Sequence, residues 1–269
     1  QGTQGYNLGR LCAYTAGLPD SVGGMAIDRM CASGLVAIAS AAKSIMVGEH
    51  KIAVAGGLES ISLTQNKHKN AYRAQSKAVL EAMPTAYIQM IETAELVAER
   101  YAVARAAQDE YSLQSQQRTA AAQAAGKFDD EIIACAATMA VVNKETKEVS
   151  YQEVTAAKDD CNRPDTTLEG LASLKASFDG IADFDLGGTT FRKQIQRRYP
   201  DLDWKGVHHA GNSSGVVDGA AAILLASPAY AKKNGWKPRA RIVATANMGD
   251  SPTLMLNAPV PAARKVLAK

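Results

Sequence analysis

Cys31 is the residue whose type and setting most favour covalent chemistry. It stands where a short strand predicted over 22–28 gives way to an apolar helix predicted over 31–47. The first N–H groups of a helix lack partners within it and carry its positive dipole end, so they favour a thiolate over a thiol. A thiolate is an activated nucleophile, and the same N–H groups could hold an oxyanion. The alternative is a small buried apolar side chain, the usual state of a free cysteine, and position alone leaves both open.

The remaining cysteines and two adjacent histidines give weaker signals. Cys12, Cys135 and Cys161 have no comparable setting and are predicted to be packed side chains. Neither His208 nor His209 has another His or Cys at the spacing of a metal-ligand pair. Adjacent side chains on a strand point to opposite faces, so we expect one histidine inward, one outward and no metal site. No glycine fingerprint of a nucleotide-binding loop occurs either.

Small residues gather in the segment 210–215, Ala-Gly-Asn-Ser-Ser-Gly, just before an apolar strand predicted over 220–226. Such a segment allows close approach of the backbone to a ligand and offers hydroxyl and amide contacts. An ordinary turn before a core strand fits the same residues about equally well.

The composition excludes several classes of protein. The chain has 269 residues, 46% of them hydrophobic, which is enough for a sizeable core. A formal charge of +3 does not indicate a nucleic-acid binder but tolerates an anionic ligand. The basic stretches 67–77 and 192–198 are better explained as solvated faces or oligomer contacts than as phosphate sites. The apolar runs are too short to span a bilayer.

Four cysteines in a chain of this length make no disulfide framework and favour a reducing compartment. We therefore expect a cytoplasmic protein, with the mitochondrial matrix and the peroxisome as alternatives. The chain starts at Gln1 with neither a signal peptide nor a Met, so we expect it to be part of a longer gene product.

The pattern of apolar residues predicts the elements that would position these side chains. The first part has a helix over 7–16, the strand over 22–28, the helix over 31–47 buried on all sides, and a strand over 51–55 ending in a Gly-Gly turn. Strand, helix and strand make a βαβ unit, which favours a parallel or mixed sheet.

From about residue 64 the composition changes, and then the layered pattern returns. The middle part predicts helices over 87–105 and 106–125, two strands within 131–155 around a turn at 144–147, and an irregular stretch over 181–205. The last part predicts strands over 220–226 and 241–246, a helix starting at Ser227-Pro228 and another over 259–268. The predicted domains are 1–64, 65–205 and 206–269.

Several segments together resemble the thiolases. The segment 28–35, Asp-Arg-Met-Cys-Ala-Ser-Gly-Leu, with 55–62, Ala-Gly-Gly-Leu-Glu-Ser-Ile-Ser, is similar to the first signature of that family. Residues 93–98 and 108–116 resemble its loop domain, and 210–215 with 218–221 resemble the stretch that re-enters the core. The likeness covers nearly the whole chain in the right order, and it favours the nucleophile interpretation of Cys31.

The resemblance implies an α/β fold: a thiolase-like layered α/β/α core, incomplete and holding the first half only, with an inserted α+β loop domain on the coenzyme A side. It implies an acyl-CoA C-acyltransferase of the 3-ketoacyl-CoA thiolase type, acting in fatty acid β-oxidation through an acyl-cysteine, or catalysing the reverse Claisen condensation. Coenzyme A would be a substrate, with no permanently bound cofactor and no metal. A homodimer or homotetramer is expected, with acyl-CoA and CoA as partners, no nucleic acid and no membrane span.

The resemblance also assigns roles to residues beyond Cys31. Ala210 and Ser214 would line the channel of the pantetheine arm, and Phe178 would flank it. Arg163 would lie near the adenine nucleotide, where a guanidinium stacks or pairs with phosphate. Met90 would sit beside the acyl site.

The chain also departs from the family pattern. Gln89 stands where many members have a His, and 181–205 is longer than the usual link. The segments Asn-Glu-Ala-Phe, Gly-His-Pro and Cys-x-Gly-Gly-Gly do not occur here. In the family they carry the oxyanion site, the activating histidine and the second cysteine, and neither His208 nor His209 matches that histidine. Because these proton-transfer partners are missing, we expect this chain alone to be inactive.

Four alternatives remain. They are a non-catalytic acyl-CoA-binding module on a thiolase scaffold, a biosynthetic acetoacetyl-CoA thiolase, a ketoacyl-synthase-like condensing enzyme and a cysteine hydrolase. The motifs over 93–116 speak against the third, and the lack of a well-placed histidine places the fourth last.

Overall fold

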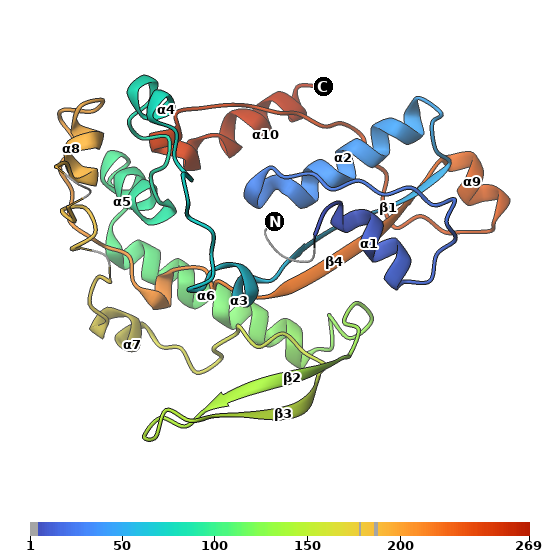
Figure 1. The fold of residues 1–269 in the computed structure, drawn as a ribbon, viewed down its shortest axis with the longest axis horizontal. Helices are drawn as coiled ribbons and strands as arrows, with labels where there is room; N and C mark the ends of the chain where they lie inside the picture. Colours follow the sequence, from blue (N-terminus) through green and yellow to red (C-terminus); the bar gives the residue numbers. More distant parts are fainter. Residues whose placement is uncertain (1–4, 178, 186–187) are drawn as a thin grey trace. The chain divides into compact units, whose positions relative to one another are not determined.

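The computed structural model describes residues 5–177, 179–185 and 188–269 (Figure 1). The chain forms two compact units. The first consists of Gln1–Ala82, Val216–Ser251 and Asn257–Lys269, and the second of Met83–Gly215 and Pro252–Leu256. The domain limits expected at 64/65 and 205/206 remain a prediction.

The first unit is built around a two-stranded antiparallel sheet of β1 (Ile52–Glu59) and β4 (Gly219–Ala226). One face of the sheet is covered by α2 (Ser33–Met46), where Ala42 packs against Ala55 and Leu225. The other elements of this unit are α1 (Leu8–Thr15), η1 (Met30–Ala32), α3 (Ile61–Thr64), α4 (Lys77–Ala82), α9 (Pro228–Lys233) and α10 (Pro259–Leu267). The helices expected over 7–16, from Ser227-Pro228 and over 259–268 are thereby confirmed.

Several expectations for this unit were wrong. The sheet is antiparallel rather than parallel or mixed, and neither 22–28 nor 241–246 is a strand. An extended segment becomes a strand only when a neighbour pairs with it, and the described residues supply no such neighbour. The Gly56-Gly57 pair lies inside β1 rather than at a turn, and a Cβ on Gly56 would stand 2.7 Å from the Ala221 carbonyl oxygen.

The helix α2 is also not buried on all sides. The side chains of Leu35 and Met46 are 74% and 83% exposed, and Ala42 is its one buried residue. Apolar composition showed that this helix can be buried, whereas burial itself depends on what packs against each face.

The second unit contains two helices and a hairpin, as expected. They are α5 (Met90–Arg100), α6 (Arg105–Ala124), and the antiparallel pair β2 (Cys135–Val142) and β3 (Val149–Ala156). Gly126 follows the end of α6 and has a φ of +66°, the left-handed conformation that commonly terminates a helix. Also present are α7 (Leu168–Ser173), α8 (Phe191–Gln196), η2 (Ala210–Asn212) and, up to Leu256, η3 (Pro252–Asn257). The stretch 181–205, expected to be irregular, contains α8, whose N-cap Thr190 accepts a hydrogen bond from the Lys193 N–H.

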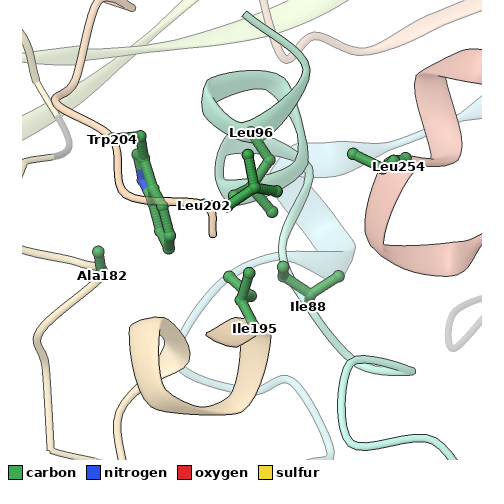
Figure 2. Close-up of a cluster of buried hydrophobic side chains, with 7 residues drawn as sticks. All are labelled: Ile88, Leu96, Ala182, Ile195, Leu202, Trp204 and Leu254. Atoms are coloured by element: carbon green, nitrogen blue, oxygen red, sulfur yellow. The ribbon is translucent and has the colours of Figure 1, made fainter. Parts of the chain in front are cut away.

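An apolar cluster holds this unit together (Figure 2). Leu96 of α5, Ile195 of α8 and Leu254 of η3 join residues from the connecting segments, namely Ile88, Ala182, Leu202 and Trp204. The guanidinium of Arg192 lies over the Trp204 ring, 4.4 Å from its centroid. Among the described residues, no helix is both long enough and apolar enough to cross a bilayer.

Candidate functional site

Cys31 sits in η1, the short turn that leads into α2, and its side chain is exposed. Side chains on either side fix this turn. The Met30 N–H donates to the Asp28 carboxylate at 2.8 Å, and the Ser33 hydroxyl accepts from the Arg29 N–H at 2.8 Å. Met30 has a φ of 49°, a left-handed conformation that costs energy in a residue with a β-carbon. The turn thus presents an accessible thiol at the start of a helix.

The other three cysteines are exposed as well, so the expectation that Cys12, Cys135 and Cys161 are packed was wrong. All four are free thiols. The type of a side chain shows only that it can be buried, whereas its exposure depends on what packs against it, and these three thiols are exposed.

A second polar group of the first unit joins two of the segments that resemble thiolase motifs. The Asp218 carboxylate accepts from the Ser62 N–H at 2.9 Å and from the Ser62 hydroxyl at 2.5 Å. The Ser62 hydroxyl lowers the pKa of Asp218, and the backbone N–H of Ser62 adds to the effect. Asp218 therefore holds the residues before β4 against those after β1.

The described residues that the resemblance assigns to coenzyme A lie in the second unit, whereas Cys31 lies in the first. Met90 is the first residue of α5 and Ala210 the first of η2, and both are exposed, as is Ser214. Arg163 is exposed and lines a cavity of about 700 Å³ together with Phe128, Lys158 and Asp159, among others. Phe178 lies outside the described residues.

Behind Ala210 lies a buried polar network. His209 is 1% exposed, and its Nε2 stands 2.9 Å from Oδ1 of Asp109, which is 2% exposed. The neighbouring His208 places Nδ1 3.0 Å from Oε2 of Glu95. The expectation of one inward and one outward histidine was therefore wrong. Because 206–209 has no strand partner, the alternation of a strand does not apply to it.

The Glu95 side chain binds the backbone of the residues just before η2. Its carboxylate accepts from the Val207 N–H at 2.9 Å and from the His208 N–H at 3.0 Å. Burial raises the pKa of Glu95, but the His208 side chain and these N–H groups outweigh burial and lower it. The same balance holds at Asp109, where burial is outweighed by Arg105 and His209 and the pKa is lowered.

The sequence pattern did not predict these buried carboxylates, although both lie in the segments 93–98 and 108–116 that resemble the thiolase loop domain. The signal was the i, i+4 spacing of Arg105 and Asp109 on α6, which joins them at 2.7 Å. Within the described ranges, no group of three or more His, Cys, Asp or Glu side chains could hold a metal ion. The network is one of hydrogen bonds and charge pairs.

The order of these motifs along the chain matches a known family. Residues 1–183 match the family profile described as the N-terminal domain of thiolase. That match covers more than half of the chain, and the chain belongs to the thiolase family, with the α/β fold of its N-terminal domain.

The chain is similar to several curated thiolases. It is 39% identical, over its whole length, to a protein of Escherichia coli strain K12 named 3-oxoadipyl-CoA/3-oxo-5,6-dehydrosuberyl-CoA thiolase. It is 38% identical, over 98% of its length, to a beta-ketoadipyl-CoA thiolase of Pseudomonas putida. It is 34% identical, again over 98%, to an acetyl-CoA acetyltransferase of Cupriavidus necator. It spans 62%, 61% and 62% of the lengths of these relatives, respectively.

Proposed function

We propose that the protein containing this chain is an acyl-CoA C-acyltransferase that cleaves 3-ketoacyl-CoA by thiolysis, with Cys31 as its nucleophile. The observation that carries the proposal is the exposed Cys31 thiol, held at the start of α2 inside the segment that resembles the first thiolase signature. Membership of the thiolase family supports it, as do relatives whose names specify 3-oxoadipyl-CoA and acetyl-CoA.

The proposed reaction has two steps, formation of an acyl-cysteine and transfer of its acyl group to CoA. The Cys31 thiolate attacks the 3-keto carbon, the bond between C2 and C3 breaks, and its electron pair leaves on the enolate of acetyl-CoA, which takes up a proton. The thiolate of free CoA then attacks the acyl-cysteine, forms the shortened acyl-CoA and releases the Cys31 thiolate. The reverse sequence is a Claisen condensation, and the relative named acetyl-CoA acetyltransferase supports a biosynthetic direction as the second candidate.

The relatives' names also bear on the acyl group. We propose a 3-oxoacyl chain that ends in a carboxylate, as in 3-oxoadipyl-CoA, in preference to a fatty acyl chain of β-oxidation. The relatives from Escherichia coli and Pseudomonas putida are named as thiolases of that kind. Comparing turnover of 3-oxoadipyl-CoA with that of a 3-oxoacyl-CoA of equal length lacking the carboxylate tests this, and a preference for the uncharged chain contradicts it.

We propose the CoA-binding roles of Met90, Arg163, Phe178, Ala210 and Ser214 on the strength of the family resemblance. The exposure of Ala210 and Ser214 supports contact with a ligand. Arg163 and Lys158 offer two cations at the cavity of about 700 Å³, which suits a nucleotide phosphate, although Asp129, Asp159 and Asp160 line it too.

We further propose that this chain alone does not catalyse thiolysis. It spans 62% of the Escherichia coli relative, and the segments that supply proton-transfer partners in the family do not occur in it. A non-catalytic acyl-CoA-binding module is the alternative that this length favours. We also propose a homo-oligomer, to be tested by the mass of the whole protein in solution, and a cytoplasmic location, which four free cysteines support.

The test compares acetoacetyl-CoA and 3-oxoadipyl-CoA thiolysis by this chain and by a longer form that restores the length of the relatives. We expect activity only in the longer form. There, Cys31→Ala should lower kcat by at least about a thousandfold, the scale of losing a covalent nucleophile. Cys135→Ala, which removes another exposed thiol, is the matched control. Activity that survives Cys31→Ala overturns the nucleophile assignment, and turnover by this chain alone overturns its inactivity.

A further inference from the structure

We propose that Asp109 is a positioning residue for coenzyme A. It holds the turn that carries Ala210 against the end of α7 through one buried network, and so sets the shape of the surface that receives the pantetheine arm. The proposal rests on the proposed function, because only that function assigns Ala210 and Ser214 to coenzyme A.

The network begins at the His209 ring, whose tautomer follows from its partners. The Gly211 N–H donates to Nδ1 at 3.0 Å, so Nδ1 carries no proton. The proton of the neutral ring therefore lies on Nε2, which donates to Asp109 Oδ1 at 2.9 Å. His209 is thus both the cap of η2 and its link to α6.

A second residue of the turn reaches the same carboxylate oxygen. Asn212 Nδ2 donates to Asp109 Oδ1 at 3.2 Å and to the Val207 carbonyl at 3.1 Å. Asn212 Oδ1 accepts from the His209 N–H at 2.8 Å, which closes a reciprocal capping box. Asp109 therefore fixes the turn at its N-cap, His209, and at its last residue, Asn212.

The other carboxylate oxygen connects the turn to α7. Arg105 Nε donates to Asp109 Oδ2 at 2.7 Å, and Arg105 Nη2 donates to the carbonyls of Leu171 at 2.7 Å and Leu174 at 2.9 Å. These carbonyls lie at the end of α7, where the Leu171 carbonyl also accepts from the Leu174 N–H at 3.1 Å. One buried carboxylate thus joins the two segments.

Close packing between η2 and α7 leaves little room for the turn to move relative to the helix. A Cβ on Gly211 would lie 2.5 Å from Leu171 Cδ2 and 3.0 Å from Leu174 Cδ1. The Ser177 N–H also donates to the His208 carbonyl at 3.0 Å, beyond α7. Because Asp109 and His209 are 2% and 1% exposed, water has little access to replace a lost partner.

The location of the network separates positioning from direct contact. Ala210 and Ser214 are exposed, whereas Asp109 is buried on α6 and reaches the turn only through hydrogen bonds that the structure shows to His209 and Asn212. Asp109 should therefore affect how tightly coenzyme A binds without touching it, and should leave the chemistry of Cys31 unaltered. In the longer, active form we expect Asp109→Ala to raise KM for CoA more than it lowers kcat.

Calorimetric titration of this chain with CoA tests the proposal directly. Asp109→Ala should weaken binding by about 10- to 100-fold, the range that losing a buried charged hydrogen bond supports. Asp109→Asn keeps an acceptor for His209 and should recover part of the loss. Glu110→Ala, at the next and exposed position of α6, is the matched control and should bind as the parent does. Parent-like binding by folded Asp109→Ala overturns the proposal.

Nuclear magnetic resonance gives a result that does not depend on coenzyme A. In the parent, the ¹⁵N signals of His209 should show Nε2 protonated and Nδ1 bare, and the Gly211 and Asn212 amides should exchange slowly. In Asp109→Asn and His209→Asn these amides should exchange faster. His209→Asn keeps a cap for the Gly211 N–H but loses the link to Asp109, so it carries the test if Asp109→Ala does not fold.

The calorimetric and exchange measurements together distinguish a failure of the proposed CoA site from a failure of the positioning role of Asp109. If the parent chain does not bind CoA while the amides respond as expected, the binding roles assigned to this chain fail and the positioning of η2 by Asp109 stands. If CoA binds but both the affinity and the amide exchange are unchanged in Asp109→Asn and His209→Asn, the positioning role is overturned and the proposed function stands.

Discussion

Glu92 is a buried glutamate on α5, and its surroundings change the pKa of its carboxyl group. It is 2% exposed, and no described residue donates a hydrogen bond to its Oε2. Burial raises the pKa of Glu92 to about 7, and the nearby Glu95 adds to the rise, while the Arg192 guanidinium opposes it. Glu92 therefore binds a proton over a range of pH in which an exposed glutamate has lost it.

This shift predicts a pH dependence of stability. Between pH 4.5 and about 7 the folded chain holds a proton on Glu92 that the unfolded chain has released, so the free energy of unfolding falls as pH rises through that interval. The fall is on the order of 3 kcal/mol. Glu92→Gln should remove it, as measured by urea unfolding at pH 5, 6, 7 and 8.

Glu99→Gln, at an exposed position of the same helix, is the control and should keep the fall shown by the parent. The pKa of Glu95 and that of Asp109 are lowered by their partners, so their contribution to stability is complete above the ordinary carboxyl pKa and is lost only in acid. An equal fall in Glu92→Gln and the parent would show that Glu92 is ionised in the folded chain.

At the scale of elements, the start of α9 shows a cap predicted from sequence and found in the structure. Ser227 follows β4, and its hydroxyl accepts from the Tyr230 N–H at 3.2 Å, with Pro228 at the first turn. The Ser227 N–H donates to the Lys51 carbonyl at 2.9 Å, so the cap also anchors the helix beside β1.

Ser227→Ala should lower the free energy of unfolding by about 1 kcal/mol, because the Tyr230 N–H loses its acceptor. Ser227→Asp should restore most of it, since aspartate also caps helices well. Urea unfolding monitored by circular dichroism measures both, and Ser21→Ala at an exposed turn is the control. A Ser227→Ala chain as stable as the parent would show that the cap contributes nothing to the folded unit.

At the scale of the whole molecule, the chain exposes more surface than its mass requires. Its solvent-accessible area is 19928 Å² for 28.4 kDa. A compact monomer of that mass exposes about 11,000 Å², and two separate domains of half the mass about 13,500 Å² together. Apolar side chains contribute part of this additional exposed area. On the face of the sheet opposite α2, the side chains of Val54 and Leu224 are 65% and 55% exposed.

The exposed apolar face predicts that this chain binds a hydrophobic dye. We expect fluorescence of anilinonaphthalene sulfonate to rise on mixing, and Val54→Lys to reduce the rise by about half or more, since it places a charge in the middle of the face. Gln152→Lys adds the same charge at an exposed polar position of the hairpin and should leave the signal unchanged. A chain that gives no dye signal, or a signal that Val54→Lys does not alter, contradicts the prediction.

Features that depend on neighbours along the chain were predictable from the amino-acid sequence. Periodicity, capping residues and turn residues predicted two helices and a hairpin, which the structure has at 90–100, 105–124 and 135–156. The same signals predicted the Ser227 cap and the position of Cys31 at the start of a helix. The order of motifs was likewise sufficient to identify the thiolase family.

Long-range pairing could not be predicted from local sequence patterns, because it depends on which segments folding brings together. The antiparallel pairing of β1 with β4 and the burial of Glu92, Glu95 and Asp109 depend on segments far apart in sequence. The bond between Asp109 and His209 joins residues 100 positions apart. Local patterns show that an aspartate or histidine can be charged, hydrogen-bonded or buried, but its state follows from the groups that folding brings within hydrogen-bond distance.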